Sequence, residues 1–176
     1  MLVAFGGGEP VILIVRRHVS VQLRPAEPGD HENVANVLIE SRAAFMPYAP
    51  SAHPRADVRA WVQRVLVPSG DVTVATVGGG VAGVLAVSNR DGYGWIEQLY
   101  VSPSLVNQGI GSTLLNHALS VLSPPIRLYT FQANTGARRF YERNGFHAVQ
   151  FTDGGENEER CPDVLLERQS VFTRGA

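Results

Sequence analysis

The stretch from Trp95 to Leu122 constrains the fold of this chain more than any other. It is typical of a strand from Trp95 to Val101, a short loop, and a helix that begins after Gly109 and Gly111. Apolar residues recur along the helical half with a 3.6-residue period: Ile110, Leu114, Leu115, Ala118, Leu119 and Leu122. A helix start carries unpaired N–H groups and a partial positive charge, and glycines allow a close approach to them. The expected guest at this helix start is therefore a phosphate.

Other interpretations of these glycines can be compared with the residues around them. A P-loop requires a Lys directly after its last glycine, whereas Ser112 and Thr113 follow here. A dinucleotide fingerprint requires a third glycine where Leu114 stands, and an acidic residue about 20 positions later, where Thr130 and Phe131 stand. Glycines that only allow tight packing of a helix on a strand remain an alternative, so the two glycines alone do not decide the question.

A second motif follows the next expected strand and reads Asn-Thr-Gly-Ala-Arg-Arg-Phe-Tyr-Glu-Arg-Asn-Gly-Phe over residues 134–146. With the first stretch it resembles the GNAT superfamily of acetyl-CoA-dependent N-acetyltransferases. There, Gln/Arg-x-x-Gly-x-Gly/Ala opens the pyrophosphate-binding helix, and Asn-x-x-Ala-x-x-Phe-Tyr-x-x-x-Gly-Phe follows the next strand. The resemblance extends more weakly over about residues 20–168. Val106 stands where the family has Gln or Arg, which implies the loss of one side-chain contact but not of binding, because backbone amides hold the phosphates.

Length and composition indicate a single domain, and the resemblance implies one acetyltransferase domain over residues 19–176, preceded by an extension over residues 1–18. The chain has 176 residues, of which 44% are hydrophobic and 18% charged, and these values are ordinary for a single domain with a full core. Sixteen acidic and fifteen basic side chains leave no net field, so no nucleic-acid partner is expected. The single Cys161 excludes an internal disulfide and fits a cytoplasmic location.

The extension carries a five-residue apolar run, Val11 to Val15, followed by Arg16, Arg17 and His18. A signal peptide has its positive charges before the apolar run, and this run is too short to span a bilayer. No membrane association is therefore expected. We interpret the extension as an extra strand or as a tail packed on a neighbour, and a homodimer stays open.

The rest of the chain predicts an α/β fold with a mixed, mostly antiparallel sheet of six to seven strands and helices on both faces. Further strands are expected over residues 19–24, 71–77, 81–88, 126–131, 146–151 and 164–169. The strand over 126–131 is expected to lie parallel to the Trp95 strand through a right-handed crossover. Asp30 is expected to cap a first helix that ends near Ala44, and Pro54 to begin a second. The core face of that second helix is expected to include Val58, Trp61, Val62, Val65 and Leu66, although Trp61 could instead contact a ligand.

The resemblance implies where acetyl-CoA binds as a co-substrate, without a metal. Its pantetheine arm is expected where the Trp95 strand splays from its parallel neighbour, along the backbone of Leu99, Tyr100 and Val101. Asn134 matches the family's asparagine near the pantetheine, although capping of the following helix would explain it equally well. The phosphates are expected at the N–H groups of Gln108, Gly109, Ile110, Gly111 and Ser112.

Two side chains are candidates for catalysis, and each has a structural alternative. Glu97 lies two residues before Leu99, so both side chains are expected on one face of the strand. The resemblance implies that Glu97 is a general base acting through water, and a salt-bridged structural Glu is the alternative. Tyr141 matches the family's tyrosine beside the coenzyme sulfur, where its hydroxyl would protonate the leaving thiolate. Its alternative is a ring packed beside Phe140 with the hydroxyl in solvent.

Two loops are candidates for the acceptor site. The proline-punctuated loop after the first helix contains Phe45 and Tyr48, which could form an apolar wall for a substrate or pack on the core. The connection over residues 152–163 holds five carboxylates. Glu158 and Glu159 among them could attract a cationic amine, although a solvated surface loop is the alternative. The isolated histidines predict no metal site.

The expected function is direct transfer of the acetyl group of acetyl-CoA to a primary amine of a small molecule or a peptide. No covalent acyl-enzyme is expected, because no activated nucleophile is evident. Two alternatives stay open: a coenzyme-A-binding module without catalysis, and an acyltransferase that uses a larger acyl chain.

Overall fold

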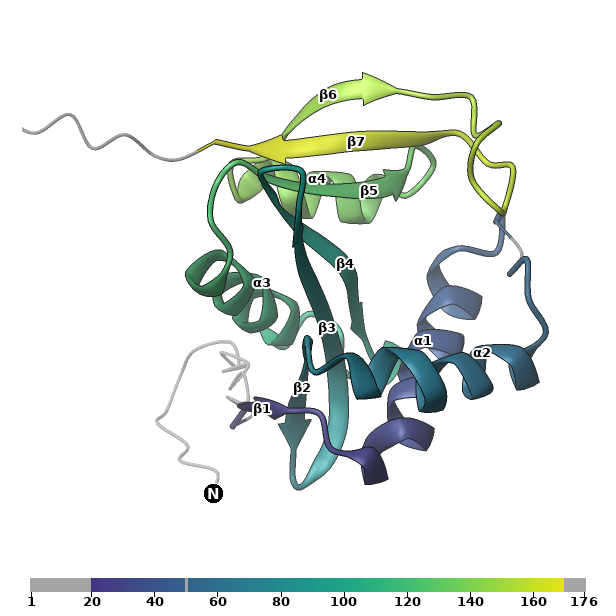
Figure 1. Ribbon diagram of the computed structural model, residues 1–176, viewed down its shortest axis with the longest axis vertical. Coiled ribbons are helices and arrows are strands. Elements are labelled where there is room, and N and C mark those ends of the chain that lie inside the picture. Colours follow the sequence, from purple (N-terminus) through teal and green to yellow (C-terminus); the bar gives the residue numbers. More distant parts are fainter. Residues whose placement is uncertain (1–19, 50, 170–176) are drawn as a thin grey trace, which may run out of the picture.

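The computed structural model describes residues 20–49 and 51–169, and its centre is a seven-stranded sheet (Figure 1). The strands lie in the order β1-β2-β3-β4-β5-β7-β6. Their bounds are β1 Gln22–Pro25, β2 Val72–Val77, β3 Gly80–Arg90, β4 Tyr93–Val101, β5 Ile126–Phe131, β6 His147–Phe151 and β7 Asp163–Arg168. Neighbouring strands are antiparallel except β4 and β5, which are parallel. The predicted fold class is confirmed, and the expected extension over residues 1–18 lies outside the described residues.

Helices cover both faces of the sheet, as predicted (Figure 1). One face carries α1 (His31–Phe45) and α2 (Arg55–Trp61), and the other carries α3 (Ile110–Val121) and α4 (Thr135–Arg143). Successive residues of β3 belong to two different cores: Leu85 clusters with Leu114 of α3, whereas Val84 clusters with Val34 of α1. The sheet therefore separates two hydrophobic cores, and each β4 side chain belongs to one side or the other.

β4 and β5 are hydrogen-bonded over a very short length. Only Gly94 with Ile126 and Trp95 with Arg127 are paired, although β4 continues to Val101. The last residues of β4 consequently have no ladder partner in β5, as the resemblance implied. The start of α3 lies beside this free end of β4, because a Cβ built on Gly111 would be 3.8 Å from the Val101 side chain.

A β-bulge at Glu97 decides which way the side chains of β4 point. Ile96 is opposite Val87 and Gln98 is opposite Ala86, so Glu97 is an extra residue in β4. A bulge interrupts the simple alternation of side chains between the two faces of a strand.

The bulge places Glu97 on the face opposite Leu99, so the expectation that both side chains share one face is wrong. Leu99 packs against the core that contains Leu85. The Glu97 carboxylate instead accepts hydrogen bonds from Ser88 and Arg90. These two residues of β3 lie an odd number of positions from Leu85 and so point to the α1–α2 side of the sheet.

Asp30 does not cap α1 with its side chain, contrary to the prediction. It ends a 3-10 turn and already has a helical backbone (φ −82°, ψ −12°), whereas a capping residue is usually extended. The carboxylate instead accepts hydrogen bonds from Arg24 at 2.6 and 2.8 Å and from the Glu27 N–H at 2.8 Å. The hydrogen bonds from Arg24 hold the pKa of Asp30 below its usual range.

A π-helical turn at Val62–Leu66 follows α2 and changes which side chains reach the core. The i→i+5 pattern adds a residue to the turn, so positions three and four apart no longer share one face. Val62 and Leu66 are buried as predicted, but Trp61 is 38% exposed and Val65 is 55% exposed. The assignment of Trp61 and Val65 to the core is therefore wrong.

Close packing of α3 on β3 depends on Gly83, and a substitution there tests it. In Gly83→Ala the new Cβ would lie 2.9 Å from the Leu114 side chain and 3.2 Å from the Tyr100 carbonyl oxygen. We expect this overpacking to lower the free energy of unfolding by about 1–3 kcal/mol in urea titrations. Gly29→Ala is the control, because nothing lies within 4 Å of its Cβ position. Equal stability of the two variants would contradict the packing argument.

Candidate functional site

The start of α3 has the backbone that an anion site requires. Gly109 is the N-cap and has φ +86°, a conformation that favours glycine. The first helical hydrogen bond runs from the Thr113 N–H to the Gly109 carbonyl oxygen at 2.9 Å. The N–H groups of Ile110, Gly111 and Ser112 precede that bond and have no partner in the preceding turn of the helix. These three amides belong to the set that the sequence predicts for the phosphates.

Gly111 differs from Gly83 because the protein's own atoms leave room beside it. A Cβ built there would lie 3.8 Å from both Phe140 and Val101, which is ordinary contact. Packing of α3 therefore does not require a glycine at this position. The absence of a side chain instead leaves space at the helix start, which fits a ligand that approaches the backbone.

Tyr141 lies in the core between α4 and the sheet. It is 7% exposed, and its ring packs edge-on against Phe140 and Phe146, with centroids at 5.2 and 5.5 Å. Burial, assisted by nearby Tyr100, raises the pKa of the Tyr141 hydroxyl. The hydroxyl therefore stays protonated at neutral pH and can serve as a hydrogen-bond donor. The ring does pack beside Phe140, but the hydroxyl is not in open solvent.

Asn134 caps the helix that carries Tyr141. Its Oδ1 accepts a hydrogen bond from the Ala137 N–H at 3.1 Å, so the capping role that the sequence left open is present. A contact between Asn134 and pantetheine stays a prediction.

Glu97 has the ion-pair partner that its structural alternative requires. Its carboxylate accepts a hydrogen bond from the Ser88 hydroxyl at 2.5 Å and forms an ion pair with Arg90. The Arg90 guanidinium also stacks over the Trp95 ring, 4.0 Å from its centroid. Glu97 is exposed and is not among the residues that line the cavity described next.

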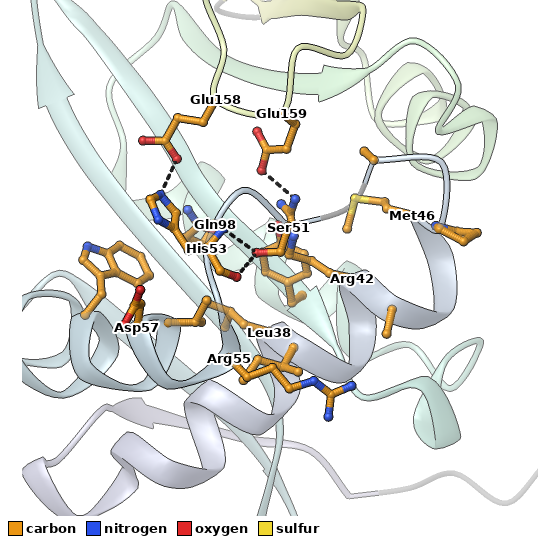
Figure 2. Close-up of a pocket in the computed structure, with 17 residues that line it drawn as sticks. Leu38, Arg42, Met46, Ser51, His53, Arg55, Asp57, Gln98, Glu158 and Glu159 are labelled. Carbon is orange, nitrogen blue, oxygen red and sulfur yellow. Dashed lines mark hydrogen bonds and ion pairs between the residues drawn. The ribbon is translucent and has the colours of Figure 1, made fainter.

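A cavity of about 640 Å³ lies on the α1–α2 side of the sheet (Figure 2). Gln98 and Tyr100 of β4 line it from the sheet, and Arg42 lines it from α1. Its volume is that of a site for a small molecule. The last residues of β4 thus contribute side chains to both sides of the sheet. Leu99 and Val101 face α3, and Gln98 and Tyr100 face this cavity.

The loop after α1 reaches the cavity through other side chains than predicted. Met46, Pro47 and Ala49 line it, whereas Phe45 and Tyr48 do not. The Tyr48 ring instead packs edge-on against Phe131 of β5, with centroids 6.2 Å apart. Both predicted aromatic residues are partly exposed, at 41% and 39%.

The connection over residues 152–163, here called the acidic loop, is held by its own hydrogen bonds. The Asn157 side-chain amide donates to the Cys161 carbonyl oxygen at 2.7 Å and to the Asp163 carboxylate at 2.8 Å. Gly154 has φ +85°, and a Cβ there would lie 2.3 Å from the Cys161 backbone. The loop is therefore folded tightly on itself, which gives its side chains fixed positions.

Two carboxylates of the acidic loop line the cavity and contact basic side chains across it (Figure 2). Glu159 pairs with Arg42 at 2.6 Å, and their side chains are 17% and 22% exposed. Glu158 contacts His53 at 3.0 Å, and both side chains are mostly exposed. The predicted pair of glutamates therefore borders the cavity, although each already has a partner.

Arg42, His53 and Gln98 line the cavity but were not predicted as site residues. Trp61, for which contact with a ligand was the stated alternative, also lines it. One signal was available for Arg42, because it stands four positions after Leu38 and so continues the apolar face of α1. Burial, the largest effect, lowers the pKa of Arg42, but Tyr100 and Glu159 together outweigh it and raise the pKa. Arg42 therefore keeps its charge, and its Nε is buried without a hydrogen-bond partner.

Residues 20–49 and 51–169 contain neither a membrane-spanning helix nor a cluster of metal-binding side chains. No helix there combines the length and the apolar character needed to cross a membrane. The same ranges hold no group of three or more His, Cys, Asp or Glu side chains that could bind a metal ion.

Most of the chain matches known proteins. The family model described as Acetyltransferase (GNAT) family matches residues 38–146, more than half of the chain. The uncharacterized N-acetyltransferase YafP of Escherichia coli K12 is 27% identical over 136 residues, which cover 74% of this chain and 84% of YafP. An uncharacterized N-acetyltransferase of Archaeoglobus fulgidus is 29% identical over 151 residues, which cover 79% of this chain and 100% of that protein.

Solved structures share the fold. Apo YjaB from Escherichia coli has a TM-score of 0.69 at 21% identity, covering 84% of this chain and 97% of YjaB. The PaiA N-acetyltransferase from Thermoplasma acidophilum, in complex with coenzyme A, has a TM-score of 0.67 at 19% identity. That match covers 86% of this chain and 99% of the PaiA chain. At these identities the likeness concerns the fold.

The Glu159–Arg42 and Glu158–His53 contacts should differ in their effect on stability. We expect Glu159→Gln to lower the free energy of unfolding by about 1–3 kcal/mol, because it leaves the largely buried Arg42 guanidinium without its anionic partner. Glu158→Gln removes the same charge from an exposed pair, and should change stability by at most about 0.5 kcal/mol. Urea titrations at pH 7 measure both values without screening the charges. Equal losses would contradict the difference in burial.

Proposed function

The chain belongs to the GNAT family of acetyltransferases, and from this premise we propose that it transfers the acetyl group of acetyl-CoA to a primary amine. The short pairing of β4 with β5 is the observation that carries the proposal. The free end of β4 has the start of α3 on one side of the sheet and the 640 Å³ cavity on the other. A donor held on the α3 side and an acceptor held in the cavity can therefore meet at this strand.

The residues present fit coenzyme A. The amides from Gln108 to Ser112 would hold its phosphates, and the backbone of Leu99, Tyr100 and Val101 would pair with its pantetheine arm. The space beside Gly111 and the positive φ of Gly109 support this assignment, as does the coenzyme A bound to the PaiA relative. Val106 offers no charge to the phosphates, so the amides would carry the binding.

Acetyl-CoA supplies an acetyl group that is activated as a thioester. In the transfer a carbon–sulfur bond breaks and a carbon–nitrogen bond forms, while the amine loses a proton and the thiolate gains one. Tyr141 is the proposed general acid: it would donate a hydrogen bond to the sulfur as negative charge develops there and then pass its proton to the thiolate. Its raised pKa keeps this donor protonated throughout the neutral range.

Glu97 is the proposed general base and would act through water. Its side chain lies on the cavity side of the sheet, next in sequence to Gln98, and is open to solvent. The ion pair with Arg90 fixes its orientation. Because Glu97 does not itself line the cavity, a water would relay the proton from the amine to its carboxylate. A cytoplasmic location and one acetyltransferase domain over residues 19–176 complete the proposal.

The cofactor assignment predicts a graded effect of side chains at position 111. Gly111→Val should raise the dissociation constant for coenzyme A by about 100-fold or more, since losing two charged hydrogen bonds removes about 3–6 kcal/mol. Gly111→Ala is the matched control, because its Cβ fits the available space, and should bind within about tenfold of the wild type. Calorimetry measures both. Wild-type affinity in a folded Gly111→Val variant would contradict the phosphate site.

The proposed proton path predicts different effects for its two residues. Tyr141→Phe should lower kcat by about 10²–10⁴-fold with little change in coenzyme A affinity, because only the donor to the sulfur is lost. Glu97→Gln should lower kcat/KM at neutral pH and regain activity at alkaline pH, where the amine is already deprotonated. The measurement is kcat/KM against pH.

Wild-type pH profiles in both variants would contradict this path, and transfer would then depend on positioning alone. Tight coenzyme A binding by the wild-type protein without acetylation of any amine would instead favour a binding module without catalysis. Faster transfer from a longer acyl-CoA than from acetyl-CoA would favour the larger acyl group.

A further inference from the structure

The charges of the cavity are arranged unevenly. Arg42 is its inward cation, and Glu159 already pairs with it at 2.6 Å. Arg55 also borders the cavity but is exposed, and its side chain extends away from Glu158 and Glu159 (Figure 2). Two further carboxylates, Asp57 and Glu158, line the cavity without a Lys or Arg partner among the described residues. An entering ligand therefore meets unneutralised negative charge and no free inward positive charge.

Apolar side chains form most of the remaining wall. They come from α1, α2 and the loop between them, and include Leu38, Met46, Val58 and Trp61. The Trp61 side chain does not stabilise the hydrophobic core, since the π-helical turn after it leaves this residue 38% exposed. A large aromatic surface on a small-molecule cavity is suited to the apolar body of a ligand and to a cation above its face.

From these features we infer that the acceptor is a small amphipathic primary amine with an apolar body and no carboxylate group. The inference rests on the proposed acetyl transfer and names the class of amine that this cavity accepts. The apolar wall would hold the body of the amine. Gln98 and Tyr100 line the cavity from the strand where the acetyl group would lie. Their amide and hydroxyl groups would be available to orient the reacting nitrogen.

The Arg42–Glu159 pair acts as a filter against amino acids. Glu159 already neutralises the single charge of Arg42, so a carboxylate on the acceptor would gain the attraction of a free cation only by displacing Glu159, which would leave that carboxylate without its partner. Without such displacement the ligand's carboxylate would lie among Asp57, Glu158 and Glu159 and be repelled. An amine that lacks the carboxylate avoids both penalties.

Matched acceptors test the inference directly on the wild-type protein. Phenethylamine with phenylalanine, tyramine with tyrosine, and tryptamine with tryptophan differ within each pair only in the carboxylate. With acetyl-CoA in excess, we expect kcat/KM for the amine to exceed that for the amino acid by about tenfold or more in each pair. Equal or better use of the amino acids would overturn the inference.

Removal of the filter gives a second and independent readout. Glu159→Gln frees Arg42 to bind a carboxylate, so the amine-to-amino-acid ratio of kcat/KM should fall by about tenfold. Glu156→Gln is the control, because it removes the same charge from the same loop and does not line the cavity. A ratio that changes equally in both variants, or in neither, would overturn the role of Arg42 and Glu159.

The outcomes separate this inference from the proposed function. Coenzyme A binding by calorimetry, with acetylation of amino acids in preference to amines, sinks the inference and leaves the N-acetyltransferase standing. Coenzyme A binding without transfer to any of the six compounds also sinks it. Failure to bind coenzyme A at all would sink the proposed function itself.

Discussion

The two-residue contact between β4 and β5 is the constraint on which the rest of the site depends. The end of β4 is paired with β3 on one side but with no strand on its β5 side, so the N–H and C=O groups that point to that side must be satisfied by water or by a ligand. In this protein the unpartnered residues lie beside a helix start whose amides are also unpaired, so two sets of backbone donors and acceptors face the same space. An extended ligand that carries both amide and phosphate groups suits this arrangement. In the proposed function, the separation of the strands would position the cofactor without any catalytic side chain.

The bulge at Glu97 then determines what each β4 residue does. One extra residue in the strand sends Gln98 and Tyr100 to the cavity and leaves Leu99 and Val101 against α3. The backbone of one short segment can thus pair with a ligand while its side chains contact two different compartments. Gly83 supports the same geometry from the neighbouring strand, because it lets α3 approach closely.

The acidic loop closes the cavity by two contacts of unequal strength. Its internal hydrogen bonds hold Glu158 and Glu159 in place, and these meet His53 and Arg42 from the opposite wall. Because Arg42 is neutralised while Glu158 remains largely in solvent, the loop contributes both a structural contact and the charge that an incoming amine encounters. Surface acidity counted along the sequence would not distinguish these two roles.

The sequence by itself determined the strands from β1 to β7, the helix start at Gly109 and the family, since apolar period and glycine placement are local properties of the chain. It also placed Glu158 and Glu159 in a candidate acceptor loop. Only the tertiary structure decided that Arg42 meets Glu159, because these residues are 117 positions apart and no local pattern records their contact. The face of Glu97 and the exposure of Trp61 were likewise decided by a bulge and a π-helical turn, each of which shifts side chains by one extra residue. Such irregularities break the regular periods from which sequence predictions are made, and here they lie next to the proposed site.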